Sequence, residues 1–258
     1  MTNTLLVDHR SDHITILTIN RPAQRNALDL ATMRAFSKAV NDLAGDSELR
    51  AVIVTGTGTE SFCSGGDLYE LHQYTSEADA RMMITLMGDT LLALERLPVP
   101  VIAAINGYAL GGGSELALAC DIRIADDQTR MGFVQAKLAL IPGWGSGQRL
   151  LRIAGYARAM DLLLSARILN APELLASGLV NRVVETGSAL EHALLYAQHF
   201  SHYPLTVIHS IKSLLQAGLN QPYDAALKTE RDLFPSLWAA DAHIQAVETF
   251  LNRNRKTS

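Results

Sequence analysis

The sequence has few residues that form covalent or metal cross-links. It contains two cysteines among 258 residues, Cys63 and Cys120, and neither belongs to a Cys-x-x-Cys pair. This count excludes a disulfide framework and a structural zinc site. A chain of this length buries about three quarters of the surface that its unfolded state exposes. We therefore expect a hydrophobic core, without metal, to stabilise the fold.

Charged residues are also scarce. They make up 19% of the chain, against a typical value of about 25%, and the formal net charge is −4. The low charge indicates that part of the surface lies between subunits. The acidic balance argues against binding to nucleic acid, which requires a basic face.

Long hydrophobic runs are missing as well. The longest apolar stretch, residues 97–105, contains Pro98 and Pro100 and is far shorter than the roughly 20 residues of a membrane-spanning helix. Residues 1–13 carry charges at Asp8, Arg10 and Asp12, so no secretory signal is predicted and we expect a cytoplasmic protein.

Alternating strand patterns and helical periodicity predict an α/β fold. Residues 5–9 and 13–20 alternate in the manner of a hairpin, and apolar residues recur at threes and fours from residue 30 to residue 43. Further strands are expected at residues 51–55, 101–105, 122–125 and 180–184, with helices at 82–97, 114–119, 146–153, 158–164 and 172–177. From residue 189 the pattern is helical only, in the stretches 190–200, 205–218 and 223–253. We therefore expect a layered core over residues 1–200 and a helical region over residues 201–258.

Two glycine-rich segments, residues 61–67 and 106–115, each follow a predicted buried strand. Glycine is required where the backbone takes a positive φ or comes close to a bound group. The start of a helix also has free N–H groups that favour negative charge. Two such turns that converge would direct two N–H donors at one carbonyl oxygen, as in an oxyanion hole.

An acidic residue stands beside the second of these segments. Glu115 lies three residues after Gly112, nearly one helical turn away on the same face. Its carboxylate is therefore a candidate to move a proton at the carbon next to the polarised carbonyl. The alternative is that the glycines form a plain strand-to-helix turn and that Glu115 is a first-turn acid favoured by the helix dipole.

The sequence from Asn106 to Asp121 resembles the signature of the enoyl-CoA hydratase/isomerase (crotonase) superfamily. Further matches occur in the expected order at Asn20-Arg21-Pro22, Asn26-Ala27-Leu28, Phe62-Cys63-Ser64-Gly65-Gly66-Asp67 and Ile141-Pro142-Gly143. The resemblance implies a β/α spiral core with a C-terminal helical trimerisation region, in a homotrimer or a dimer of trimers. It also implies an acyl-CoA substrate whose thioester oxygen is bound by the N–H groups of Gly66 and Gly112. Nothing in the sequence indicates a metal or a cofactor other than the coenzyme A of the substrate.

The resemblance also implies an acyl-CoA site. Arg25 takes the position near the CoA phosphates, and the other expected substrate-binding residues are Ala27, Ser64, Asp67, Leu68, Tyr108 and Trp144. Arg255 and Lys256 are candidates for the 3′-phosphate, although a solvated tail is the interpretation we prefer for Lys256.

The sequence departs from the hydratase pattern at Gln135, where hydratases of the family place a second glutamate. Hydration requires both an acid and a base, so losing one is expected to cost about 10²–10⁴ in rate. Gln135 can still orient a water or a substrate carboxylate, with Glu115 making both proton transfers.

Residues 133–145 are similar to the branch that decarboxylates ethylmalonyl-CoA or methylmalonyl-CoA. Loss of CO₂ forms the thioester enolate directly and needs no base. Trp144, with Leu140 and Ile141, is either an apolar wall that favours neutral CO₂ or plain core packing.

We therefore predict a lyase that decarboxylates an alkylmalonyl-CoA-type substrate, with Glu115 as the proton donor. Enoyl-CoA hydration and double-bond isomerisation with this single carboxylate are the alternatives. An RNA-binding or non-catalytic homologue is the alternative of another class, and the lack of a basic stripe opposes the RNA-binding version.

Overall fold

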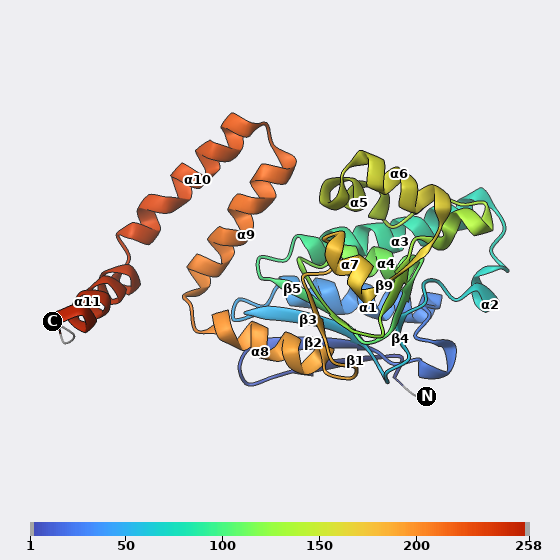
Figure 1. Cartoon of the computed structure of the whole chain (residues 1–258), viewed down its shortest axis with the longest axis horizontal. Coiled ribbons are helices and arrows are strands. Elements are labelled where there is room, and N and C mark those ends of the chain that lie inside the picture. Colours follow the sequence, from blue (N-terminus) through green and yellow to red (C-terminus); the bar gives the residue numbers. More distant parts are fainter. Residues whose placement is uncertain (1–2, 256–258) are drawn as a thin grey trace. The chain divides into compact units, whose positions relative to one another are not determined.

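A computed structural model describes the chain from residue 3 to residue 255, with side chains up to residue 252. The chain divides into two compact units, one ending at His199 and the other beginning at Phe200 (Figure 1). No helix within residues 3–255 combines the length and the apolar character that crossing a membrane requires.

The larger sheet forms the centre of the first unit. Its six strands lie in the order β1 (Leu5–His9), β2 (Ile14–Ile19), β3 (Ala51–Gly56), β5 (Val101–Ile105), β7 (Ile122–Asp126) and β10 (Arg182–Val184). The β1–β2 pair is antiparallel and the other pairs are parallel. Every residue of β3 and β5 is buried, as expected for parallel strands covered on both faces. The hairpin and the buried strands predicted from the sequence are thus confirmed.

A second sheet runs beside the first. It contains β4 (Ser61–Cys63), β6 (Tyr108–Leu110), β8 (Arg130–Gly132) and β9 (Ile168–Asn170). Strands β4, β6 and β8 directly follow β3, β5 and β7 in the chain. Each repeat then continues into a helix: α3 (Glu77–Glu95), α4 (Gly112–Ala119) or α5 (Ser146–Ala154). This repetition builds the β/α spiral that the resemblance implies, and the glycine-rich segments contain short strands where the sequence indicated loops.

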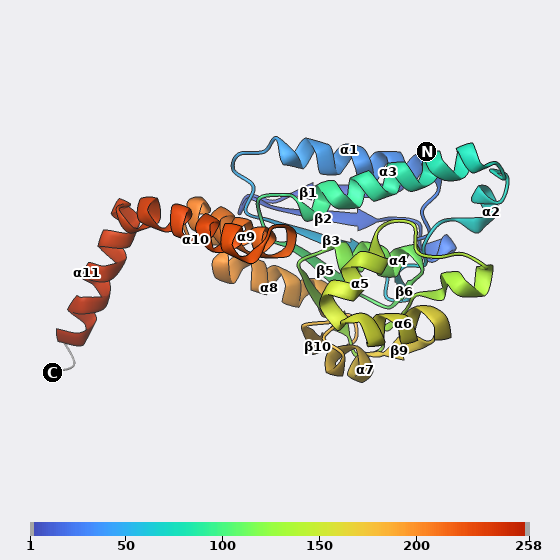
Figure 2. The ribbon, with the colours of Figure 1, turned by 90° about the horizontal axis from the view of Figure 1, so that it is seen from above.

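Helices cover the larger sheet. Helix α1 (Leu30–Ala44) and α3 lie side by side in Figure 2, and α1 buries the apolar face that its periodicity predicts, including Met33, Phe36 and Val40. The remaining helical segments of the first unit are η1 (Pro22–Gln24), α2 (Leu68–Leu71), η2 (Val134–Leu138), α6 (Tyr156–Ser165), α7 (Ala171–Ala176) and α8 (Ala189–Ser201), the last of which runs across the division. The segment after Asp67 forms the single turn α2, and α3 begins five residues before the predicted residue 82.

The second unit contains α9 (Leu205–Asn220), α10 (Tyr223–Trp238) and α11 (Asp241–Arg255), and α9 packs on α10. The prediction of one continuous helical stretch over residues 223–253 is wrong. Helix α10 ends where the N–H of Ala239 turns back to the carbonyls of Leu237 and Pro235. Both residues of the break, Ala239 and Ala240, are alanines, which favour helix, so composition gave no signal for the end.

The two glycine-rich segments meet backbone to backbone. A Cβ atom added at Gly113 would lie 1.8 Å from the carbonyl oxygen of Cys63, and one added at Gly65 would lie 3.0 Å from the amide nitrogen of Gly112. Gly65 also has a φ of +102°, which L-residues with side chains rarely adopt. The close approach of β4 to the start of α4 therefore requires glycine at these positions.

We expect Gly113→Ala to destabilise the protein, although alanine is normally the better helix former. The added methyl group overlaps the Cys63 carbonyl, and overpacking of this kind costs about 1–3 kcal/mol. Thermal unfolding followed by circular dichroism measures the effect. Gly147→Ala in α5 is the matched control, because nothing lies within 4 Å of its added Cβ, and it should leave stability unchanged or raise it by up to about 1 kcal/mol. Equal stability of the two variants would contradict the close approach.

Candidate active site

The first of the two turns presents the backbone amide of Gly66. Leu28 donates its N–H to the carbonyl of Gly65 (2.8 Å), and Asp67 donates its N–H to the carbonyl of Leu28 (2.9 Å). In such a parallel bridge the N–H of the central residue points away from its partner strand. Within residues 3–255, no protein acceptor receives the N–H of Gly66.

The second turn presents the amide of Gly112. Gly111 has a φ of +54° and donates its N–H to the carbonyl of Gly132 (2.9 Å), which fixes the entry into α4. Gly112 is the first residue of α4, where N–H groups have no partner inside the helix. Its N–H finds no acceptor in the described part of the chain either. Because Gly65 adjoins the nitrogen of Gly112, the structure brings both predicted donor turns together.

Glu115 lies in the first turn of α4 and is 2% exposed. Its Oε1 accepts from Nε2 of Gln135 (2.9 Å) and from the N–H of Gly143 (3.3 Å). Its Oε2 accepts from the N–H groups of Trp144 (2.7 Å) and Ser146 (3.1 Å). The carboxylate is thus buried with two N–H donors on each oxygen, which offsets the cost of removing it from water.

Gln135 lies in η2 and turns its amide nitrogen toward Glu115. This orientation follows from charge, because a carboxylate only accepts hydrogen bonds and would repel the amide oxygen. The Oε1 atom of Gln135 is buried and has no hydrogen-bond partner in the chain as described, and the same holds for Oγ of Ser146. The structure therefore places the predicted pair Glu115 and Gln135 in direct contact, with one unused acceptor beside it.

Trp144 forms a wall of this site. A Cβ atom added at Gly112 would lie 2.2 Å from the indole ring, so the ring packs on the α-carbon of that residue. Trp144 is 8% exposed and belongs to the main hydrophobic core. Leu140 and Ile141, expected beside it, are 60% and 84% exposed, so in this chain they do not close the wall. The ring of Trp144 is thus part of the core and also borders Gly112, while its effect on a departing CO₂ stays a prediction.

Four of the predicted substrate-binding residues gather around the turn that precedes Leu28. Ser64 donates its N–H to the carbonyl of Arg25 (3.1 Å), and Ala27 is buried beside them. Asp67 caps α2 by accepting from the N–H of Tyr69 (3.1 Å) and pairs with Arg21. Leu68, on α2, and Tyr108, at the start of β6, both expose their side chains.

Arg25, expected near the CoA phosphates, is paired with a carboxylate. Its Nε donates to Glu60 (3.0 Å), and both side chains are largely exposed. An exposed pair of this kind contributes at most about 1 kcal/mol, so a phosphate can displace it. The side chains of Arg255 and Lys256 lie outside the described residues.

Cys63 lies at the first turn without serving as a nucleophile. Burial raises the pKa of its thiol to about 12, which keeps it protonated near neutral pH. Among the described residues, no three His, Cys, Asp or Glu side chains gather as metal ligands would.

The sequence did not indicate two features of this site. The three backbone donors to Glu115 come from residues 143–146, and backbone N–H groups carry no sequence signal because nearly every residue has one. The second feature is Arg21, whose motif was recognised but whose partners were not. Only the fold shows that the backbone donors reach Glu115 and that Arg21 reaches Asp67, next to the first turn.

Comparisons with known proteins agree with this geometry. The family model described as enoyl-CoA hydratase/isomerase matches residues 9–257. The chain is 36% identical over 243 residues to a short-chain-enoyl-CoA hydratase of Clostridium acetobutylicum, covering 94% of this chain and 92% of that protein. It is also 36% identical over 238 residues to an ethylmalonyl-CoA decarboxylase of Gallus gallus, covering 91% of this chain and 79% of that one.

Among solved structures, the chain is similar to an enoyl-CoA hydratase from Bacillus anthracis. The TM-score is 0.92 at 32% sequence identity, and the match covers 97% of each chain. The observed α/β architecture is therefore the crotonase fold. With both glycine turns, the buried glutamate and the family match in place, the chain belongs to the enoyl-CoA hydratase/isomerase (crotonase) superfamily.

Proposed function

We propose that the protein is a lyase that decarboxylates an alkylmalonyl-CoA-type substrate. Relatives named as hydratases and as a decarboxylase are equally similar, so their names do not choose between the reactions. The observation that carries the proposal is the contact between Glu115 and Gln135, which leaves one titratable carboxylate where hydratases of the family place two. Decarboxylation needs one proton donor and no base.

The oxyanion hole supplies the driving interaction in this mechanism. The N–H groups of Gly66 and Gly112 donate to the thioester oxygen. As the bond between the α-carbon and the carboxylate breaks, its electron pair forms the enolate and CO₂ leaves. Donors fixed in advance stabilise the developing charge without reorganisation. For the next step Glu115 takes up a proton from solvent, and the protonated oxygen gives up one of the N–H bonds that it accepts. The enolate then re-forms the carbonyl while its α-carbon takes that proton from Glu115.

Trp144 and Gln135 shape the space in which this occurs. The indole ring beside Gly112 gives an apolar surface, which disfavours a carboxylate relative to neutral CO₂. Gln135 holds Oε1 of Glu115 and so orients the group that moves the proton.

Enoyl-CoA hydration is the second candidate, and one observation favours it. The free Oε1 acceptor of Gln135 lies beside Glu115, so each residue of the pair can accept a hydrogen bond from one O–H of a single water molecule. Glu115 would then serve as base and acid in turn. Double-bond isomerisation needs no water, and Glu115 would again serve as base and acid in turn by moving a proton between two carbons.

Incubation with ethylmalonyl-CoA and crotonyl-CoA tests the proposal. We expect CO₂ release to exceed hydration and, in D₂O, the product to carry one deuterium at the α-carbon. Glu115→Gln should lower kcat by about 10²–10⁴, because it removes the proton donor. The exposed Glu48→Gln is the matched control and should retain full activity. Rapid hydration without CO₂ release would overturn the proposal. Unchanged activity in Glu115→Gln would show that Glu115 is not the proton donor, and no activity of the wild-type protein toward either substrate would indicate a non-catalytic protein.

Gln135→Glu should move the enzyme toward hydration. It places a second carboxylate next to Glu115, and two adjacent carboxylates share a proton. We expect the ratio of decarboxylation to hydration to fall at least about tenfold and the pH profile of kcat to gain an ionisation. The control is Gln128→Glu, an exposed position, where neither quantity should change. An unaltered ratio and profile in Gln135→Glu would show that the residue does not select the reaction.

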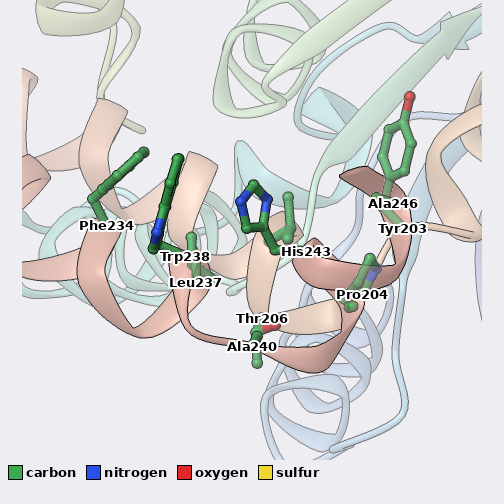
Figure 3. Close-up of a pocket in the computed structure, with 11 residues that line it drawn as sticks. Tyr203, Pro204, Thr206, Phe234, Leu237, Trp238, Ala240, His243 and Ala246 are labelled. Carbon is green, nitrogen blue, oxygen red and sulfur yellow. The ribbon is translucent and has the colours of Figure 1, made fainter. Parts of the chain in front are cut away.

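We also propose that the protein assembles as a homotrimer or a dimer of trimers through its C-terminal unit. Helix α10 is amphipathic, yet none of its 16 residues is buried. A cavity of about 350 Å³ lies in this unit, between α10, α11 and the start of α9. Figure 3 shows Phe234, Trp238 and His243 along it, and the rings of Trp238 and His243 are 4.5 Å apart. Exposed aromatic surface of this kind is typical of protein interfaces.

Light scattering coupled to gel filtration should give three or six times the 28.0 kDa mass of one chain. Trp238→Arg should reduce the mass toward that of one chain, because a charge replaces an apolar contact. Tyr156→Arg, at an exposed tyrosine of α6, is expected to retain the assembly. A monomeric wild-type protein at micromolar concentration would refute the assembly.

A further inference from the structure

The guanidinium of Arg21 lies where three segments of the first unit meet. Its Nη2 is 2.9 Å from Oδ2 of Asp29 and 2.9 Å from Oδ2 of Asp67, while Nη1 donates to the carbonyl of Ala27. The side chain of Arg21 is 13% exposed, and Asp67 is 8% exposed. One cation thus holds two carboxylates that would otherwise repel each other in a region largely shielded from water.

Each of these carboxylates also begins a helix. Oδ1 of Asp29 accepts from the N–H of Thr32 (2.7 Å) at the start of α1. Oδ1 of Asp67 accepts from the N–H of Tyr69 (3.1 Å) at the start of α2. Both oxygens of each aspartate are therefore engaged, and rotation of either side chain breaks a cap.

The pairing with Asp67 bears directly on Gly66, which precedes it. The backbone of Asp67 is fixed by its N–H bond to Leu28, and its side chain is fixed by Arg21. On the other side, the carbonyl of Gly65 accepts from Leu28. The direction of the Gly66 N–H is therefore set by neighbours that are held on both flanks.

We propose that Arg21 is a positioning residue for the oxyanion donor Gly66, acting through Asp67. This inference rests on the proposed function, in which the Gly66 N–H binds the thioester oxygen. Arg21 touches neither the substrate nor the reacting atoms. Its contribution is to keep the donor aimed before the substrate arrives, and an oxyanion hole depends on such preorganisation.

A purely structural cross-link would behave differently. It would lower the melting temperature when broken, without changing the polarisation of a bound thioester. Asp29 provides the comparison, because Asp29→Asn removes the charge that pairs with Arg21, still caps α1 and leaves the Arg21–Asp67 pair intact.

The experiment uses Arg21→Met, Arg21→Lys, Asp67→Asn and the control Asp29→Asn in the full-length protein. Bound butyryl-CoA, which has no carboxylate to lose, reports the carbonyl polarisation through the infrared shift of its thioester stretch. Turnover gives kcat and KM separately. We expect Arg21→Met and Asp67→Asn to reduce the shift and to lower kcat by about 10- to 100-fold with KM nearly constant, less than the full loss of a donor.

Arg21→Lys should keep part of the infrared shift, because an ammonium group reaches one carboxylate but cannot bond both aspartates and the Ala27 carbonyl as the guanidinium does. Asp29→Asn should keep the full infrared shift even if its melting temperature falls as far as that of Arg21→Met. If folded Arg21→Met or Asp67→Asn retains the wild-type shift and kcat, the positioning role is wrong while the proposed function stands. If wild-type protein binds butyryl-CoA without any carbonyl shift, the proposed function fails and this inference fails with it.

Discussion

The carboxylate of Glu115 lies inside the first unit with two N–H groups on each oxygen. Without these donors, burying the charge would lower the free energy of unfolding by several kcal/mol. Three of its four donors are backbone amides of residues 143–146, and Ser146 is the first residue of α5, where the helix dipole also favours negative charge. The charge and the conformation of this loop therefore depend on each other. Through them, the start of α4, which carries Gly112, is joined to the start of α5.

The same carboxylate determines what Gln135 can do. Because Glu115 accepts the amide nitrogen, the amide oxygen turns away and becomes the free acceptor. A glutamate at position 135 would instead compete with Glu115 for a proton. The choice between an amide and a carboxylate at position 135 thus decides whether the site has one titratable group or two, while the fold stays the same.

The sequence was sufficient for those parts of the molecule that have a repeating chemical pattern. The fully buried runs at β3 and β5 and the apolar stripe of α1 have enough residues to show their periodicity. Strands β4, β6, β8 and β9 contain three residues each, too few for any period, and tertiary pairing alone defines them. The two glycine turns and the Glu115–Gln135 pair were indicated by residue type, whereas the backbone donors and the partners of Arg21 were not, since contacts between distant segments leave no local pattern. The break between α10 and α11 was missed because alanines fill it.

The origin of the donors around Glu115 also bears on how the protein is made. The glutamate emerges from the ribosome 20 residues before Gln135 and 31 residues before Ser146. A nascent chain that ends between Glu115 and Gln135 contains the glutamate without its donors. The carboxylate stays in water until residues 135–146 have been synthesised. Domains generally fold as units during synthesis, so a chain of this intermediate length lacks the native site. In this chain, the synthesis of α5 marks the length at which the reaction centre first becomes able to close.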